Sequence, residues 1–183
     1  MEWIILIVVI VVIGGWLVGA YNGFISSRNR VDEAFSTMDV YMVKRYDLIP
    51  NLVETVKGYA SHEKETLEGV ITARNHAVNA NTMDEKMAAE GEISGVLSRL
   101  FALSEAYPDL KANQQFLDLQ NQLKIVEEDI AQSRKYYNGT VRSYNTGIQS
   151  FPNNLVAGIF KFEKRQSFVV DDPTQRQNVK VQF

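Results

Sequence analysis

Residues 3–20 read WIILIVVIVVIGGWLVGA, an unbroken run of apolar residues and glycine, and no residue between Glu2 and Arg28 is charged. A membrane-spanning helix needs about 20 consecutive apolar residues, so we predict a transmembrane helix that contacts the lipid bilayer through residues 3–20. The competing interpretation is a cleaved signal peptide, but the apolar run is long for one and an acidic residue precedes it. We therefore assign residues 1–27 to a retained anchor and its juxtamembrane segment.

Two further features of this segment bear on function. Arg28 and Arg30 are the first charges after the anchor, so the positive-inside rule places the following body in the cytoplasm. Gly15 and Gly19 lie four residues apart on one helix face, where small residues let two membrane helices approach closely. We expect a homo-oligomer formed through this face. The alternative is a chance pair, because glycine is common in membrane helices.

The composition excludes several classes of function. With 183 residues, no cysteine and two histidines, the chain has room for one modest domain and cannot form disulfides or thiolate metal sites. The formal net charge of -3 predicts no nucleic-acid partner. Zinc-protease, di-iron, nucleophile-elbow and phosphate-loop motifs are missing from the sequence. We predict a protein that is not an enzyme and has no catalytic residues, no metal and no cofactor.

After residue 30 the apolar residues recur at steps of three and four, which predicts helices packed on other helices. The first series comprises Val31, Phe35, Met38, Met42, Ile49, Leu52, Val56 and Tyr59. The spacing continues to about Val78, so either one helix covers residues 28–79 or two helices meet near Gly58 with Ser61 as an N-cap. Pro50 must then kink the first helix or lie in a first turn after Asp47.

Local signals place the later helices. Thr82 and Glu85 form a capping-box pattern that predicts the start of a helix ending near residue 106. Pro108 interrupts the apolar spacing. It resumes over residues 116–148, the clearest amphipathic helix in the chain, and Pro152 ends it.

Helix lengths favour a break near Gly58. At 1.5 Å per residue, one helix over residues 28–79 would be roughly 75 to 80 Å long, whereas the helix over residues 83–106 would be only about 36 Å. A break gives four segments that alternate in direction. We predict an all-α fold, an antiparallel up-down four-helix bundle over residues 28–152, followed by a short apolar and basic segment and a polar tail over residues 153–183.

Charged residues on or beside the apolar seams are unusual, because charges are seldom buried unless they are paired. We expect them to meet in one polar cluster with nearby polar side chains. The predicted members are Arg45, Asp47, Glu63, Arg74, Glu127, Arg134, Tyr137 and Asn138. The favoured interpretation is a polar layer that fixes helix register, and the alternative is a ligand-binding or catalytic site.

Residues 155–165 interleave Ile159, Phe160 and Phe162 with Lys161, Lys164 and Arg165. This composition suits an anionic membrane surface. Packing of the segment against the end of the bundle is the favoured alternative.

Several separated blocks resemble the LemA family in the order in which they occur. They are YN at 21–22, RYDLIPNLV at 45–53, VKGYA at 56–60, HE at 62–63, AR at 73–74, YPDLKAN at 107–113, YYN at 136–138, YN at 144–145 and FP at 151–152, with Phe116, Leu119, Gln120, Leu123, Glu127 and Arg134 between them. The resemblance implies a bacterial inner-membrane protein with an antiparallel four-helix bundle and no established reaction. The family's link to magnetosome membrane formation and to membrane metalloproteases implies membrane organisation or an adaptor role.

These observations predict a non-enzymatic, membrane-anchored scaffold or adaptor that self-associates or organises membrane-protein partners. Two alternatives stay open: a membrane-remodelling protein, and a bundle that senses a ligand through the Arg/Glu cluster.

Overall fold

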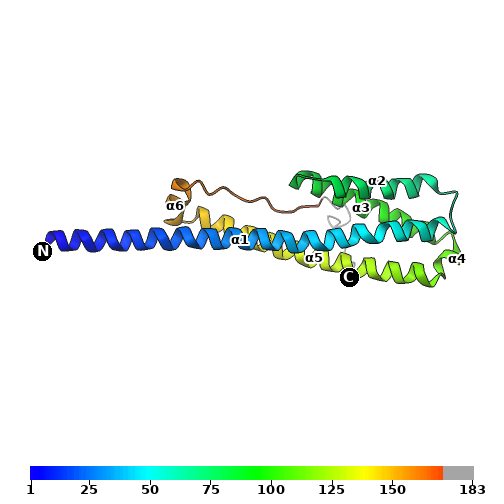
Figure 1. Cartoon of the computed structure of the whole chain (residues 1–183), viewed down its shortest axis with the longest axis horizontal. Coiled ribbons are helices and arrows are strands. Elements are labelled where there is room, and N and C mark those ends of the chain that lie inside the picture. Colours follow the sequence, from blue (N-terminus) through cyan, green and yellow to red (C-terminus); the bar gives the residue numbers. More distant parts are fainter. Residues whose placement is uncertain (171–183) are drawn as a thin grey trace, which may run out of the picture. The chain divides into compact units, whose positions relative to one another are not determined.

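The computed structural model describes residues 1–170, which form helices and no strand (Figure 1). The prediction of an all-α fold is confirmed for these residues. The helices are α1 (Glu2–Lys57), α2 (Lys64–Asn79), α3 (Met83–Ser104), α4 (Pro108–Lys111), α5 (Gln114–Gln149) and α6 (Asn153–Ile159). The polar tail predicted for the end of the chain lies outside the described residues from position 171 onward.

The apolar segment and the first helix of the body are one continuous helix. α1 continues without a break across the predicted boundary between anchor and body at residues 27 and 28. It contains Pro50 in its interior and ends at Lys57. A helix break near Gly58 is therefore confirmed. The prediction of Ser61 as the next N-cap is wrong, because Glu63 donates its backbone N–H to the carbonyl of Ala60 and itself takes the N-cap position without a side-chain cap.

The capping box that opens α3 is confirmed. The hydroxyl of Thr82 accepts from the backbone N–H of Glu85 at 3.2 Å, and the Glu85 carboxylate accepts from the N–H of Thr82 at 3.0 Å. It also accepts from the N–H of Asn81 at 2.8 Å. These backbone hydrogen bonds, from Thr82 first and then Asn81, stabilise the charged carboxylate and lower the pKa of Glu85.

The chain divides into two compact units, and α1 and α5 contribute to both. Unit 1 comprises Met1–Asp39 and Ala131–Ser167, and unit 2 comprises Val40–Ile130 together with the described residues 168–170. In unit 2, α2 and α3 lie side by side (Figure 1). Five helices contribute fully buried apolar side chains to it, among them Met42, Ile49, Leu52, Val56, Val70, Ile93, Leu100, Leu110, Phe116 and Leu123.

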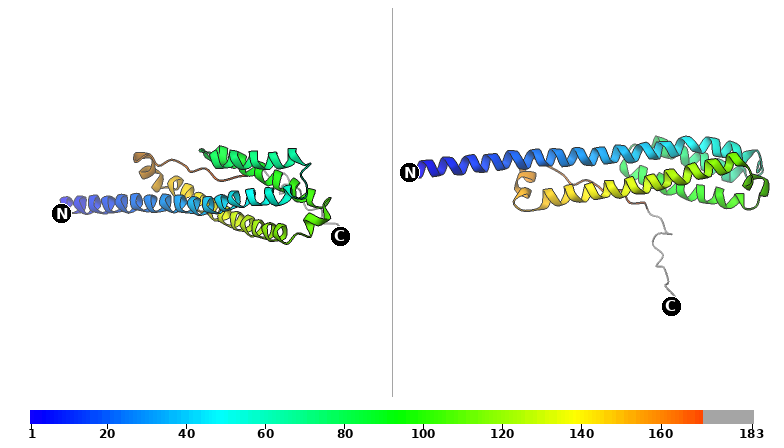
Figure 2. Two further views of the ribbon diagram at one scale, coloured as in Figure 1. Left: turned by 45° about the vertical axis from the view of Figure 1, so that its right-hand side comes forward. Right: turned by 90° about the horizontal axis from the view of Figure 1, so that it is seen from below.

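In unit 1, α1 and α5 run antiparallel. The rings of Phe35 and Tyr137 lie 5.6 Å apart, and ten residues later on α5 a Cβ at Gly147 would lie 3.9 Å from the ring of Phe24. The C-terminal end of α5 therefore lies nearer to the apolar segment of α1 than its preceding turns do. The short helix α6 follows the end of α5 (Figure 2). The peptide bond between Phe151 and Pro152, which lies between the two helices, is cis.

A non-glycine residue in the left-handed conformation ends α6. Lys161 has a φ of 54°, and Phe162 donates its N–H to the carbonyl of Ala157 at 2.9 Å while Lys161 donates to Gly158 at 3.4 Å. Together these two bonds form a Schellman motif, in which glycine normally takes the left-handed position. A lysine there costs about 1 to 2 kcal/mol of backbone strain.

Lys161→Gly is expected to stabilise this helix end by about 1 kcal/mol, because glycine adopts positive φ without a Cβ clash. Amide hydrogen exchange of Phe162 in the full chain in detergent should slow by about fivefold. Lys164→Gly is the matched control, since Lys164 does not have a positive φ. Faster exchange in Lys161→Gly would contradict the strain argument.

Candidate functional site

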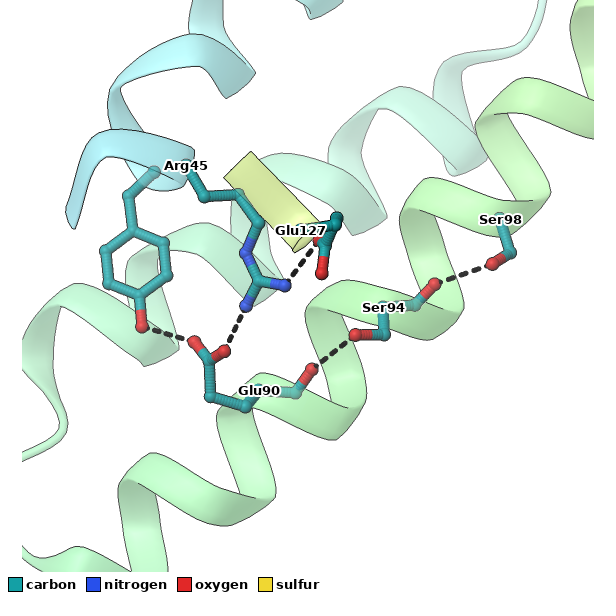
Figure 3. A network of polar contacts seen from close by, with 6 residues as sticks. Arg45, Glu90, Ser94, Ser98 and Glu127 are labelled. Atoms are coloured by element: carbon teal, nitrogen blue, oxygen red, sulfur yellow. Dashed lines mark hydrogen bonds and ion pairs between the residues drawn. The ribbon is translucent and has the colours of Figure 1, made fainter. Parts of the chain in front are cut away.

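A buried ion-pair network joins three helices of unit 2. Arg45 on α1 donates to the carboxylate of Glu127 on α5 at 2.6 Å and to the carboxylate of Glu90 on α3 (Figure 3). Arg45 is 1% exposed and Glu90 is 3% exposed, whereas Glu127 is 41% exposed. The Arg45–Glu90 pair is therefore desolvated, and the contact with Glu127 is partly screened by solvent.

Helix periodicity places the guanidinium in the core. Arg45 lies on the same face of α1 as Met38, Met42, Ile49 and Leu52, which are all fully buried. Burial opposes the positive charge, but the charges and hydrogen bonds of Glu90 and Glu127 outweigh it and raise the pKa of Arg45 above its ordinary value. The guanidinium thus keeps its charge inside the protein.

The second oxygen of Glu90 is also bound. It accepts a hydrogen bond from the phenol of Tyr46, so both carboxylate oxygens have partners on α1. Arg74 on α2 donates to the backbone carbonyl of Tyr46 at 3.4 Å, which brings the remaining long helix of unit 2 to the edge of the network. Arg45 Nε is the buried side-chain atom without a hydrogen-bond partner among the described residues.

Two serines shown beside the network stay within their own helix. Ser94 donates to the carbonyl of Glu90 at 3.0 Å and Ser98 donates to the carbonyl of Ser94 at 2.8 Å (Figure 3). Because both bonds join residues four apart on α3, they add no link to another helix.

A second polar cluster lies in unit 2, among the turns that precede α2, α4 and α5. Tyr107, before α4, donates to Glu63, before α2, at 3.0 Å. Asn113 donates to the hydroxyl of Tyr59 at 2.9 Å, and its side-chain oxygen caps α5 by accepting from the N–H of Phe116. The hydrogen bond to Glu63 favours the protonated phenol and raises the pKa of Tyr107. These contacts join the turn before α2 to the turns around α4.

The structure brings together only part of the predicted polar cluster. Arg45 and Glu127 meet, Arg74 reaches the backbone beside them, and Glu63 binds Tyr107 instead. Asp47 is exposed on α1. The other three predicted members belong to unit 1: Arg134, Tyr137 and Asn138.

Sequence reasoning missed two members of the network, Glu90 and Tyr46. A signal for Glu90 exists, because it lies on the apolar face of α3 with Ile93, Leu97 and Leu100 at the expected spacing. Tyr46 carries no such distinguishing signal, since a buried tyrosine on an apolar face is ordinary.

In unit 1 the predicted residue Tyr137 binds the chain's own later segment. Its hydroxyl donates to the carbonyl of Gln166 at 2.8 Å, and Asn145 exchanges two hydrogen bonds with the backbone of Arg165 at 2.8 and 2.9 Å. Arg165 in turn pairs with Asp32 on α1 at 2.9 Å. Burial raises the pKa of Tyr137 although Arg165 opposes the shift. These side chains hold residues 165–166 against α1 and α5.

Surface grooves in unit 1 border these residues. One of about 810 Å³ is lined by Ser27 and Arg30 on α1 and by Lys135, Tyr136 and Ser143 on α5, together with other α5 side chains. A second groove, of about 500 Å³, includes Arg134 and Asn138 in its lining. Within residues 1–170, no three His, Asp or Glu side chains are grouped so that they could hold a metal ion.

The apolar segment of α1 is the other predicted functional element. Among the described helices, α1 is the one long and apolar enough to cross a membrane, and none of its apolar window is buried. A Cβ added at Gly15 or Gly19 would have no neighbouring atom within 4 Å among residues 1–170. The same holds for Gly23, which extends the glycine face by one further step of four and which the sequence analysis missed.

Comparison with known proteins gives consistent matches. Residues 34–183 match the LemA family. The chain is 27% identical over 142 residues to Protein LemA of Metamycoplasma hominis, an alignment that covers 76% of this chain and 64% of the relative. Magnetosome protein MamQ 2 of Paramagnetospirillum magneticum is 24% identical and Magnetosome protein MamQ of Magnetospirillum gryphiswaldense 22% identical, each over 174 residues that cover 81% of this chain and 64% of the relative. The chain thus spans just under two thirds of the length of these relatives.

Replacement of one member of the buried Arg45–Glu90 pair is expected to lower the free energy of unfolding strongly. Replacement of both members should lower it much less. Glu90→Leu should lower the free energy of unfolding by about 3 to 5 kcal/mol, because it leaves Arg45 buried without its main counter-charge. The double variant Arg45→Met with Glu90→Leu should recover most of that loss. Urea unfolding followed by circular dichroism measures both.

Glu128→Leu is the control for these variants, because Glu128 is exposed on α5, and it should change the stability by less than about 0.5 kcal/mol. If the double variant lost as much unfolding free energy as the two single variants together, Arg45 and Glu90 would not act as a coupled pair that fixes the helices.

Proposed function

Because this chain belongs to the LemA family and its first helix carries an exposed apolar segment, we propose that it is a single-pass membrane protein that self-associates or organises partner proteins at the membrane. It performs this role as a scaffold or adaptor and not as an enzyme. The observation that carries the proposal is the continuity of α1, which runs from the apolar segment into the polar network as one helix. One helix thus carries both the proposed anchor and Arg45.

The exposed glycine face supports self-association. Gly15, Gly19 and Gly23 follow one another at steps of four, and among the described residues no neighbouring side chain lies within 4 Å of a Cβ built at these positions. In a membrane, such a face lets two helix backbones approach until van der Waals contacts stabilise the pair. The proposed partner at this face is a second copy of the chain.

The proposal extends to the arrangement of the body. We propose an anchor over residues 1–27, an antiparallel up-down four-helix bundle over residues 28–152 and a C-terminal region over residues 153–183. The antiparallel run of α1 and α5 in unit 1 and the adjacent packing of α2 and α3 in unit 2 support this arrangement. The Arg45 network, which ties α1 to α3 and α5, also supports it.

We further propose that the anchor lies in the bacterial inner membrane with the body in the cytoplasm. Arg28 and Arg30 support this orientation, because basic residues next to a span are enriched on the cytoplasmic side.

Replacement of the two predicted interface glycines is expected to weaken assembly. Gly15→Leu with Gly19→Leu should raise the dissociation constant of the full-length oligomer by about tenfold, equivalent to about 1.4 kcal/mol, because leucine side chains hold the backbones apart. Mass measurements over a concentration series in detergent report the change.

Gly14→Leu is the matched control for this pair. Gly14 lies about 140° around the helix from Gly19, and a Cβ at this position also meets nothing within 4 Å. Assembly through the glycine face would be excluded if the Gly14 variant and the double variant behaved alike.

The orientation has a direct test, since the chain has no native cysteine. Ile125→Cys introduces one thiol at an exposed position of the body. A membrane-impermeant maleimide should leave it unlabelled in intact cells of an expression host and label it after the inner membrane is opened. Labelling in cells with only the outer membrane opened would place the body on the other side.

A further inference from the structure

The short helix α6 has an apolar face that is exposed within the described part of the chain. Leu155 is 55% exposed and Ile159 is 68% exposed, and these residues lie one helical turn apart on the same face. Phe151 before the helix and Phe160 after it are 81% and 51% exposed. We call residues 151–160 the α6 segment.

The opposite face of α6 is firmly packed. Val156 is fully buried and Ala157 is 4% exposed, and the Schellman motif fixes the end of the helix. The segment is therefore amphipathic: one face of α6 holds it to the protein and the other presents Leu155 and Ile159, while Phe151 and Phe160 are exposed at its two ends.

Aromatic contacts locate the segment beside the end of the apolar span. The ring of Phe160 lies 4.8 Å from that of Tyr21, the residue that directly follows residues 3–20. The ring of Phe162 lies 5.7 Å from Tyr21 and 5.1 Å from Phe24. All these residues belong to unit 1.

This position corresponds to a particular depth in the bilayer. Eighteen helical residues from 3 to 20 extend for about 27 Å, close to the roughly 30 Å of the hydrocarbon core. Tyr21 then falls in the layer where lipid chains meet the headgroups, which is where tyrosine is enriched in membrane proteins. Phe160 shares this level because its ring contacts that of Tyr21.

We propose that the α6 segment inserts its apolar face into the interfacial layer of the leaflet from which α1 emerges, as a second membrane contact beside the anchor. The inference rests on the proposed anchoring and goes beyond it, because it assigns a lipid surface to a part of the chain distant in sequence from the span. A monotopic amphipathic helix binds membranes in this way, through buried apolar area and attraction to anionic headgroups.

The charges next to the segment fit anionic lipid. Lys161 and Lys164 are exposed directly after α6, and Arg28 lies over the ring of Phe162 at 5.8 Å. The remaining charges are Glu163, which is exposed, and Arg165, which pairs with Asp32. Lys161 holds the left-handed position where glycine would be less strained. Backbone strain of this kind is concentrated at functional positions, so we assign the Lys161 charge a role at the lipid surface.

Depth-dependent fluorescence quenching tests the proposal in the full-length protein. Ile159→Cys carries an environment-sensitive dye, and the protein is reconstituted into phosphatidylcholine vesicles that contain lipids spin-labelled either near the headgroup or in mid-chain. The dye at position 159 should be quenched several-fold more by the shallow label than by the deep one. It should also be shielded from iodide in the aqueous phase.

Two control variants make the outcome specific. Tyr136→Cys places the dye at a residue that is 57% exposed in the same unit but 13 residues before the end of α5, roughly 20 Å along the helix, so lipid labels should leave it unquenched. Ile10→Cys places it within the apolar span, where the deep label should quench it most. Absence of quenching by the deep label at position 10 would refute the proposed anchor. Absence of quenching by the lipid labels at position 159 alone would refute only the inference about α6.

The remaining outcomes are also decisive. Quenching at position 159 no stronger than at position 136 would overturn the proposal. Shielding from iodide without quenching by any lipid label would overturn it too, because a second protein surface would then cover α6. Lys161→Gln with Lys164→Gln should remove the additional quenching gained when phosphatidylglycerol is included and retain the quenching seen in phosphatidylcholine. Equal gains in the double variant and the unaltered protein would refute the part of the proposal assigned to the two lysines.

Discussion

The guanidinium of Arg45 can lie in the core of unit 2 only if carboxylates from other helices reach it. A buried charge without a partner costs far more than the fold gains from most single contacts, so α3 must present Glu90 and α5 must present Glu127 at the correct height. Apolar side chains tolerate small shifts of one helix along another, whereas a hydrogen-bonded ion pair does not. The network therefore fixes the register of helices whose other buried contacts are mainly apolar. Tyr46 strengthens this constraint, because it binds the second oxygen of Glu90.

Sequence patterns that involve neighbouring residues predicted where several helices begin and end. They did not predict which side chains from different helices contact one another. The capping box of Thr82 and Glu85 and the helix end near Gly58 depend on residues only a few positions apart, and both are present. Spacing of apolar residues also identified Arg45 as a core charge. It could not identify Glu90 as its partner, because periodicity gives the face of a helix and not the residue opposite it. Glu63 illustrates the same limit: it lies beside the seam, but its neighbour is Tyr107.

The division of α5 explains why the rest of the predicted cluster is scattered. Glu127 and Arg134 follow each other at helical spacing, which favours a single polar face, yet they belong to different compact units. Beyond Ile130 the polar side chains of α5 serve another purpose. Tyr137 and Asn145 hold the backbone of residues 165–166, where they satisfy groups that have no helix or sheet to bind them. A sequence pattern cannot predict this use, because an irregular segment leaves no periodic signal.

The two large apolar surfaces of unit 1 have one physical explanation in common. A protein surrounded by water rarely exposes a continuous apolar patch without a partner for it. Unit 1 exposes both the first part of α1 and the outer face of α6, and the rings of Tyr21 and Phe160, which directly follow these two surfaces in the chain, lie 4.8 Å apart. A bilayer satisfies both at once, since its hydrocarbon core accepts the span and its interfacial layer accepts the short helix beside it. A separate protein partner for each surface would need two recognition events to achieve the same burial. In the proposed arrangement the polar network orders the helices of unit 2, and lipid supplies the burial that unit 1 does not provide for its two apolar surfaces.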